Sequence, residues 1–376
     1  MLELWVLVVL IIEVQAIPEG LACTRGSTCH VKKDHLDVFV IGDTGGIAFD
    51  VGKLSVSKPT HIQLKVADSM VKLAKRDDLD MIVNVGDNKV FEEPYNNSRL
   101  QVPVSSQFFS RLCFSSGLWW PAITIISAMS RLRSRIPIGV TSGKQLQLNS
   151  SDCLSRIFPS LYYKTSYSFG RNGTRVEFVF IDTVVLCGNA NNVKSRSIFS
   201  WIGVKTRIPE RPAAKYVDES KKQWKWIEEQ LRRSTANHLY VVGHYPIHSV
   251  VTKTLQCLKE KLDPLMRKYK VSAYFAGHNH NLQYFRDSKP QNEWQMRYIV
   301  SGAGSRSGSW GRQKGNDGNV QLLYRFPKFL ESPITSELGV GEGGFVQLKI
   351  EPNAARLRFY ARNLQMEHED LIPSRH

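Results

Sequence analysis

The sequence predicts an α/β fold in which several strands end at one edge of a sheet. Four short apolar runs each stop at a glycine that is followed directly by an aspartate or a histidine. Stretches with helical spacing lie between these runs. The length of 376 residues and the 42% hydrophobic content suffice for one large domain or two smaller ones. The four runs are Asp37–Ile41, Met81–Val85, Leu239–Val242 and Tyr274–Ala276.

The chain begins with a segment typical of a signal peptide. The apolar run Leu4–Ile12 is followed by Val-Gln-Ala, a small-residue pattern suited to cleavage after Ala16. The run is too short to span a bilayer. Glu3 is the only charge before it, whereas signal peptides usually carry a basic residue there, so a retained anchor is the alternative. We expect residues 1–16 to be removed and the protein to be secreted or lysosomal.

The first two apolar runs each end at an aspartate. Asp43 lies in GDTGG and Asp87 lies in GDN. Residues 60–76 show apolar positions at helical spacing and read as the crossover helix between the two strands. In open α/β sheets the ligand crevice lies outside the carboxyl ends of the strands, so the two carboxylates are expected side by side. By itself, each aspartate could instead be a helix N-cap or an Asx-turn.

Periodicity predicts further elements along the chain. Asp218 is expected to cap the start of an amphipathic helix. The last three strands are expected to complete a second sheet. No fold is predicted for 91–155. The predicted elements are a hairpin of Tyr163–Phe169 and Val176–Ile181, helices at Asp218–Arg233 and Leu255–Tyr269, and strands near Val320–Arg325, Gly344–Ile350 and Ala355–Ala361.

Histidines follow the last two apolar runs. His244 lies in GHYP, and His278 and His280 lie in GHNH, where Gly277 permits the turn that lets both rings converge. Neutral imidazole is the commonest protein metal ligand in this pH range. His-x-His alone is equally explained by a surface loop. The two aspartates and three histidines together predict a metal site, and mixed oxygen and imidazole ligation fits iron, zinc or manganese.

Cysteine usage and glycosylation signals agree with a protein of an oxidising compartment. The chain has six cysteines, and Asn-x-Ser/Thr occurs at Asn96, Asn149 and Asn172. Asn172 is the preferred acceptor because it falls in the predicted hairpin turn.

The formal net charge of +16 would attract acidic substrates. No nucleic-acid recognition motif is visible, so nucleic acid is not predicted as a partner.

The glycine blocks GDTGG, GDN, GHYP and GHNH resemble those of the metallophosphoesterases, and more narrowly those of the purple, or tartrate-resistant, acid phosphatases. The resemblance covers roughly 36–88 and 156–360, with order and spacing kept. It implies a sandwich of two mixed β-sheets flanked by α-helices, forming a single domain over 17–376. Besides the four glycine blocks, it rests on VADSM at 66–70, DTVVLCGN at 182–189, NLQY at 281–284 and YIVSGAG at 298–304.

The resemblance also implies ligands and a reaction. A ferric ion would be held by Asp43, Asp87 and His280. A second, divalent ion (iron, zinc or manganese) would share Asp87 and add His244 and His278. The implied activity is hydrolysis of phosphate monoesters at acidic pH, with phosphoproteins or nucleotides as candidate substrates and no membrane span after signal cleavage.

The family pattern also bears on a pair of cysteines and on one further histidine. Cys187 and Cys257 fall where the family forms a disulfide. His248, four residues after His244, is a candidate proton donor, but a structural role is the preferred interpretation because the family usually has an aromatic residue there.

The chain departs from the family pattern at two places. The family's tyrosine ligand falls three residues after Asp87, where this chain has Val90. The GNHD or GNHE block, which supplies an asparagine ligand and a catalytic histidine, does not occur between Asp87 and Asp182. The alternative function is therefore a catalytically impaired, secreted phosphatase-like glycoprotein.

A shifted reading frame would restore the second block. Residues 120–135 read WPAITIISAMSRLRSR, with no hydrophobic period. Joining the third base of each codon to the first two of the next permits AGNHDHFGNVTAQIE, which is what the family carries here. We hypothesise a frameshift or splice error within 91–155; the alternative is that the chain lacks the block.

Sequencing the transcript across the codons for Asp87 to Arg156 tests this hypothesis. We expect a message that restores AGNHDHFGN, with a tyrosine near position 90 as a further restoration to look for. A message in the printed frame would contradict the hypothesis, and the site would then lack two ligands and a histidine.

Overall fold

The structure is a computed structural model, and the fold is described over the larger part of the chain. The predicted signal peptide at 1–16, Val90, Asn96 and Asn149 lie outside the described residues. The described ranges are 28–45, 47–51, 54–58, 60–87, 123–127, 154–157, 160–187, 214–252, 254–290, 293–308, 316–328, 336, 338–361 and 363–376.

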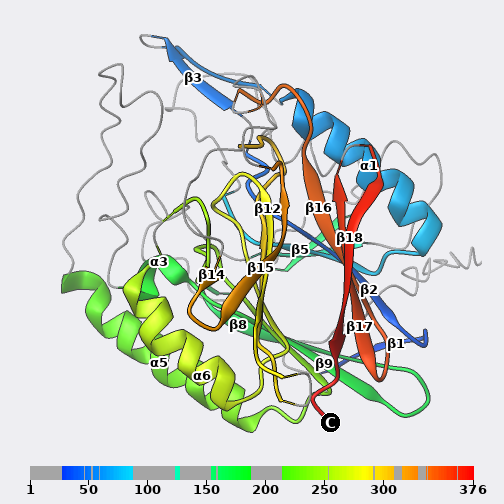
Figure 1. The fold of residues 1–376 in the computed structure, drawn as a ribbon, viewed down its shortest axis with the longest axis vertical. Coiled ribbons are helices and arrows are strands. Elements are labelled where there is room, and N and C mark those ends of the chain that lie inside the picture. The colour runs from blue at the N-terminus through cyan, green and yellow to red at the C-terminus, as the bar shows by residue number, and fades with distance from the viewer. Residues whose placement is uncertain are drawn as a thin grey trace, which may run out of the picture.

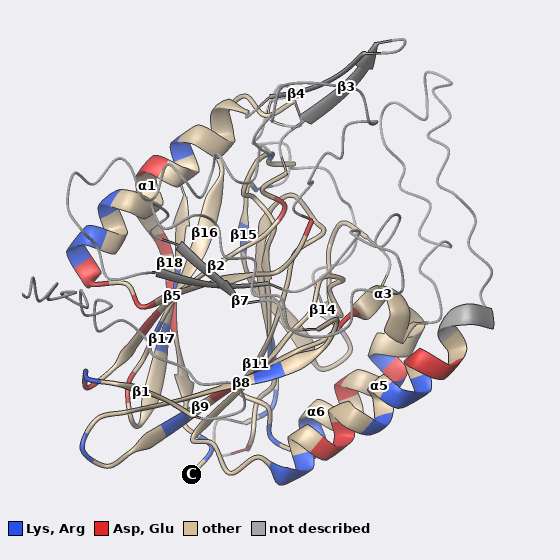
Figure 2. Ribbon diagram, turned by 180° about the vertical axis from the view of Figure 1, so that it is seen from behind, with Lys and Arg blue, Asp and Glu red and all other residues tan. Residues whose placement is uncertain are grey.

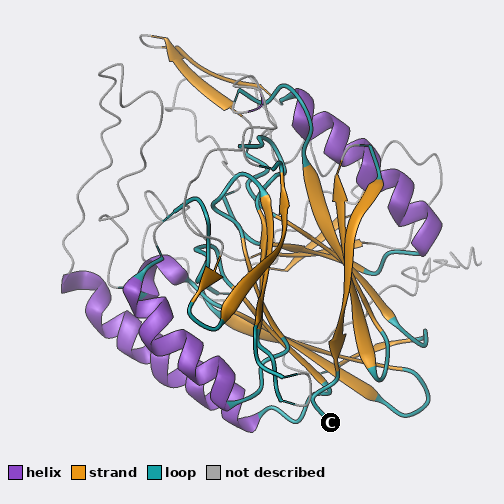
Figure 3. Cartoon of the chain, viewed as in Figure 1, coloured by secondary structure: helices purple, strands orange, loops and turns teal. Residues whose placement is uncertain are grey.

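Two mixed β-sheets form the centre of the molecule (Figure 1, Figure 3). The first sheet has the strand order β1-β8-β9-β10-β11-β13-β12-β15-β14 within the described residues. Its strands β9, β10, β11 and β13 run parallel to one another. The bounds are β1 (Cys29–Val31), β8 (Tyr163–Phe169), β9 (Thr174–Phe180), β10 (His238–Val242), β11 (Ala273–Ala276), β12 (Leu282–Asp287), β13 (Arg297–Ser301), β14 (Asn316–Asp317) and β15 (Val320–Phe326).

The second sheet has the order β18-β17-β16-β2-β5-β6-β7, with β2, β5, β6 and β7 parallel. A separate two-stranded ribbon joins β3 (Ile47–Val51) to β4 (Leu54–Lys58). The bounds of the second sheet are β2 (Leu36–Ile41), β5 (Met81–Asn84), β6 (Ile123–Ser127), β7 (Leu154–Ile157), β16 (Gly344–Ile350), β17 (Ala354–Ala361) and β18 (Gln365–Pro373).

The central strands are buried on both faces, which explains why the sequence shows them as continuous apolar runs. In β2, Val38 and Val40 join the cluster between the sheets, whereas Phe39 and Ile41 face the opposite way. Strand β10 alternates in the same manner between the inner core and its outer helices. The period of two along each strand therefore builds three hydrophobic layers from two sheets.

Helix α1 (His61–Asp77) covers the outer face of the second sheet. Its start is specified locally, because Thr60 and Gln63 form a capping box in which each side chain accepts from the other's backbone N–H. Lys75 and Arg76 in the last turn complement the helix dipole. Ile62, Val66, Ala67, Met70 and Leu73 are among its buried residues.

The outer face of the first sheet is covered by α5 (Ala214–Arg233) and α6 (Asp263–Lys268), which follows the π-helical turn η3 (Leu258–Leu262). The short helix α3 (Thr183–Leu186) is capped by Asp182. A disulfide with a Cα–Cα distance of 5.7 Å joins Cys187, just after α3, to Cys257, just before η3. The ribbon in Figure 2 is coloured by residue type and shows both acidic and basic residues along α5 and α6.

The architecture confirms the predicted α/β sandwich, and the hairpin is as predicted. Its turn holds Asn172 exposed between Gly170 and Gly173, but glycosylation there stays a prediction. In the described part of the chain, none of the helices is long and apolar enough to cross a membrane.

Three structural expectations were wrong. Asp218 does not cap α5, because the helix already begins at Ala214. Strand β15 pairs with β12 of the first sheet, so only β16 and β17 join the second one. Within 91–155, where no element was predicted, β6 and the first half of β7 extend the second sheet beyond β5.

An ionisable group is buried beneath the end of α1. Asp37 at the start of β2 accepts a hydrogen bond from Gln347 (2.7 Å), and Lys349 and His35 lie 3.8 and 3.5 Å from its other oxygen. Burial raises the pKa of this carboxyl from 3.8 to about 6, despite the hydrogen bond and the lysine. The folded protein therefore binds this proton more tightly than the unfolded chain.

We expect this group to make folding more favourable in acid. Its contribution to the free energy of unfolding is about 3 kcal/mol. This contribution is fully present below about pH 4 and is lost as the pH rises through 6. Asp37→Asn keeps the acceptor for Gln347 and should remove this difference, as measured by urea unfolding between pH 4 and 7. Asp218→Asn, on the exposed side of α5, is the control. An unchanged pH profile for Asp37→Asn would contradict the assignment.

Candidate metal centre

The predicted ligands come from both sheets and meet at one edge of the sandwich. Asp43 and Asp87 follow β2 and β5 of the second sheet, and His244 follows β10 of the first sheet. His278 and His280 follow β11, the neighbour of β10. One sheet therefore supplies the carboxylates and the other supplies the imidazoles.

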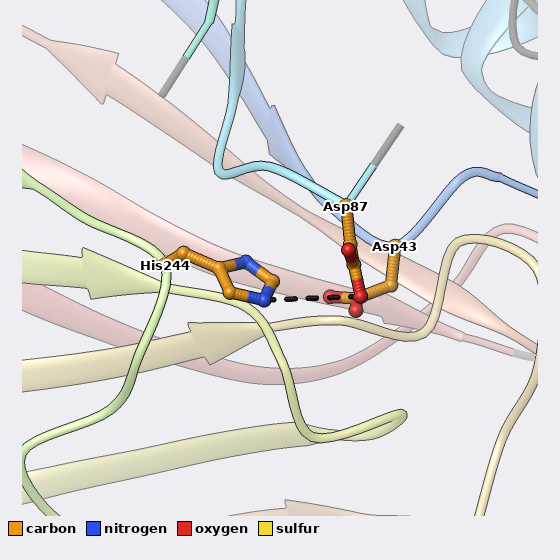
Figure 4. A group of neighbouring side chains, drawn as sticks. All are labelled: Asp43, Asp87 and His244. Atoms are coloured by element: carbon orange, nitrogen blue, oxygen red, sulfur yellow. Dashed lines mark ion pairs between the residues drawn. The ribbon is translucent and has the colours of Figure 1, made fainter. Parts of the chain in front are cut away.

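Three of these side chains form a tight group (Figure 4). Asp43, Asp87 and His244 each offer one ligand atom, and these atoms lie within 4.8 Å of one another. His244 Nε2 is 3.9 Å from Asp87 Oδ2. This spacing leaves room for an ion between donors that would each approach it to about 2.0–2.2 Å.

The tautomer of His244 is set by the backbone of the other sheet. Its Nδ1 lies 2.9 Å from the carbonyl oxygen of Val85, which can only accept, so Nδ1 carries the proton. Nε2 is then the basic nitrogen, and it faces Asp87. A hydrogen bond of this kind fixes the ring of a metal-binding histidine and raises its basicity.

The two histidines of GHNH lie on either side of this group. His280 Nε2 is 3.7 Å from Asp43 Oδ1. The His278 ring packs edge-on against the His244 ring at a centroid distance of 5.3 Å, and its backbone N–H donates to Asp43 Oδ2 (2.8 Å). The structure thus brings all five predicted residues to one edge, although the tight group combines residues that the family resemblance divides between two ions.

Burial divides the site into an inner and an outer side. The side chains of His244 and Asp43 are only 1% and 2% exposed, whereas those of Asp87 and His280 are 16% and 23% exposed. A ligand from solution can therefore approach on the side of Asp87 and His280.

The electrostatics favour imidazoles that are ready to bind a cation. Burial lowers the pKa of His280 well below 6.5, and the positive charge of Arg306 lowers it further, against the opposite effect of Asp87. Metal binding requires the neutral ring, so His280 is a competent ligand in mildly acidic solution. Two carboxylates and neutral imidazoles form a donor set that fits iron, zinc or manganese.

Three of the five side chains are held by unusual backbone. Asp43, Asp87 and His278 have φ values of 55°, 56° and 68°, in the left-handed region that costs non-glycine residues energy. Asp43 is stabilised there because its N–H donates to the carbonyl of Gly86 (2.9 Å). Strained residues of this type cluster at functional sites.

Glycines allow the two sheets to approach at this edge. A Cβ on Gly277 would lie 2.6 Å from Asp43 Oδ2 and 3.0 Å from Val85 Cγ2. A Cβ on Gly302, just after β13, would lie 2.2 Å from the carbonyl oxygen of Asn279 and 2.9 Å from Asp43 Oδ2. The carboxylate of Asp43 therefore occupies space that any side chain at these positions would fill.

Two features of the site were not predicted from the sequence. The carbonyl of Val85 orients His244, and the hydroxyl of Ser305 donates to the carbonyl of Asp43 (2.5 Å). A backbone acceptor leaves no sequence signal, whereas Ser305 follows directly on the YIVSGAG block. His248, considered as a proton donor, is buried against the Tyr298 ring at 4.5 Å, as expected for a structural residue.

Comparison with known proteins agrees with the fold. The tartrate-resistant acid phosphatase type 5 of pig (Sus scrofa) is 27% identical over 311 residues, which cover 79% of this chain and 78% of the relative. Proteins of the same name from rabbit, rat, human and mouse match as well, as do two purple acid phosphatases of Arabidopsis thaliana. The chain is a homologue of the purple acid phosphatases. No protein-family model matches it.

Solved structures share the fold of this phosphatase homologue. GAP50, the anchor in the inner membrane complex of Plasmodium, aligns with a TM-score of 0.60 and 18% identity over 92% of this chain and 90% of its own. Purple acid phosphatase PPD1 from yellow lupin (Lupinus luteus) seeds aligns with a TM-score of 0.51 and 15% identity over 91% of this chain and 54% of its own. At these identities the likeness concerns the fold, which is the metallophosphoesterase-type sandwich.

Gly277→Ala should disrupt the centre through one methyl group. The added Cβ would displace the Asp43 carboxylate, and overpacking of this kind costs about 1–3 kcal/mol. We expect a lower metal content after purification, measured by elemental analysis, and a lower urea midpoint.

Gly173→Ala is the matched control. Gly173 has a φ of 62° in the β8–β9 turn with open space around it, so alanine there strains the backbone away from the site. It should lower stability and leave the metal content unchanged. Equal metal content in both variants would show that Gly277 does not shape the centre.

Proposed function

We propose that the protein is an acid phosphatase that hydrolyses phosphate monoesters at a dinuclear metal centre. The observation that carries this proposal is the convergence of Asp43, Asp87 and His244 at the sheet edge, with ligand atoms within 4.8 Å. The names of the homologues support the reaction class. A ferric ion and a divalent ion are the proposed occupants, with zinc, manganese and iron as candidates for the second.

The proposed ligand sets follow the family resemblance. Asp43, Asp87 and His280 would hold the ferric ion, and Asp87 would also serve the divalent ion with His244 and His278. When bound, two ions supply an activated water and neutralise charge on the transferring phosphoryl group.

The residues of this chain contribute orientation and access. The bond from His244 Nδ1 to the Val85 carbonyl presents Nε2 to the centre, and the His278 N–H fixes one oxygen of Asp43. Because both bonds join the two sheets, the ligand positions are set before a substrate arrives, which is what electrostatic catalysis requires. The partly exposed Asp87 and His280 mark the side on which the phosphate ester would enter.

The proposal also covers the location of the enzyme and its class of substrates. Secretion or lysosomal delivery would follow from removal of residues 1–16, and the formal net charge of +16 would increase the encounter rate with anionic substrates. Phosphoproteins and nucleotides both carry the required group.

A second candidate is a phosphatase-like protein with impaired catalysis. Val90 stands where the family has a tyrosine ligand, and no GNHD block occurs in the printed chain. The fold also serves a protein described as an anchor, which shows that the sandwich is found in proteins that are not named as enzymes. Without tyrosinate, the protein would lack the purple colour of the family.

Metal content and hydrolysis of an aryl phosphate distinguish the two candidates. We expect the protein translated from the restored message to bind two metal ions per molecule and to hydrolyse para-nitrophenyl phosphate at pH 5. Asp87→Asn and His244→Gln should each lower kcat by about 1,000-fold or more, because several kcal/mol of metal-supplied charge stabilisation are lost.

Asp218→Asn serves as the control, because this side chain is 86% exposed on α5. It should match the unaltered protein in both measurements. If the unaltered protein binds metal and hydrolyses nothing, or binds none, the impaired candidate replaces the proposed phosphatase.

A further inference from the structure

The loop after β13 brings an arginine to the rim of the candidate metal centre. Two backbone anchors flank Arg306. The Ser305 hydroxyl donates to the carbonyl of Asp43 (2.5 Å), and the N–H of Gly308 donates to the carbonyl of His280 (2.6 Å). Because both acceptors belong to predicted metal ligands, Arg306 is fixed between the two strand ends that carry them.

Arg306 matches the partly exposed ligands in burial. Its side chain is half-buried, as are those of Asp87 and His280. The bonds to the carbonyls of Asp43 and His280 place this residue at the same edge of the sandwich as the predicted ligands.

Arg306 has hydrogen-bonding capacity to spare. Its Nε is buried and, within the described residues, has no hydrogen-bond partner. The carboxylates of Asp43 and Asp87 are directed to histidines, and neither forms an ion pair with Arg306 in the described part of the chain. Buried polar groups are nearly always satisfied, so the Nε of Arg306 is a donor that remains available to a ligand.

Resting on the proposed phosphatase function, we propose that Arg306 binds the phosphate group of the substrate through its non-bridging oxygens. A guanidinium fork matches two phosphate oxygens, and such charge-assisted pairs are stronger than neutral hydrogen bonds. Next to a centre filled with cations, a further positive charge is repelled unless an anion lies between them. Arg306 cannot give up its proton, so it binds and orients the phosphate and does not act as the general acid.

The competing explanation is that Arg306 only braces the loop that holds His280. The two roles differ in what a substitution changes. Loss of a brace would lower metal content or stability, whereas loss of a phosphate-binding residue would lower phosphate affinity in a folded, metal-loaded protein.

The test measures binding of inorganic phosphate to the full, metal-loaded chain by calorimetry, with KM and kcat for para-nitrophenyl phosphate at pH 5 beside it. For Arg306→Gln we expect the phosphate dissociation constant and KM to rise about 10- to 100-fold, the value of one or two charge-assisted hydrogen bonds. Metal content and the urea midpoint should stay unchanged. Arg306→Lys keeps the charge without the fork and should lose less affinity.

Arg171→Gln is the matched control, because it removes the same charge from the exposed β8–β9 turn. It should leave the phosphate dissociation constant unchanged. Unaltered affinity in Arg306→Gln, or a loss of metal with normal affinity in the loaded fraction, would overturn the inference. If Arg306→Gln does not fold, wild-type affinity in Arg306→Lys would overturn it as well.

The failure of this inference can be told from the failure of the proposed function. A chain that binds phosphate through Arg306 but hydrolyses no ester would retain the binding residue and lose the phosphatase assignment. A chain that hydrolyses the ester while its Arg306→Gln variant binds phosphate normally would keep the phosphatase assignment and lose Arg306 as the binding residue.

Discussion

The site depends on one constraint: the strand ends that carry the carboxylates in one sheet must approach those that carry the imidazoles in the other closely enough to form hydrogen bonds. Two bonds achieve this, from the His278 N–H to Asp43 and from His244 Nδ1 to the Val85 carbonyl. The hydroxyl of Ser301 adds a third link when it donates to the carbonyl of Val40 (2.8 Å). Each bond joins strand ends of different sheets. The sandwich therefore has to close fully at this edge before a metal site exists.

Close approach explains both the glycines and the strained backbone. Asp43 fits only because Gly277 and Gly302 have no side chains, and its left-handed φ turns the carboxylate toward the first sheet. Strain of about 1–3 kcal/mol per residue persists only where the surroundings over-determine the conformation. Here those surroundings are strands buried on both faces, such as β2 and β5. The hydrophobic layers thus hold the ligands in place.

The sequence was most informative where local rules and burial agree. Residues 60–76 carried an apolar period, so α1 was predicted nearly to its ends, and the structure adds the capping box of Thr60 and Gln63 at its start. The start of α5 was missed because Asp218 resembles a cap, yet the helix begins four residues earlier, at Ala214. β15 was placed in the wrong sheet because alternation reveals a strand but not its partner. The five candidate ligands were predicted from glycine blocks, whereas the tautomer of His244 depends on a carbonyl that no side chain encodes.

Binding of the proposed metal ions would reverse the net charge of the site. Without metal ions, the two carboxylates and the neutral imidazoles form an anionic site that attracts cations. If the proposed ferric and divalent ions were bound, the same group of residues would become cationic and would attract phosphate. Arg306 at the rim opposes the first step slightly and favours the second, so its presence makes sense for a centre whose task is to hold an anion. A site that only stored metal would gain nothing from a guanidinium beside His280. The placement of Arg306 therefore fits the anionic ligand that the proposed phosphatase function requires.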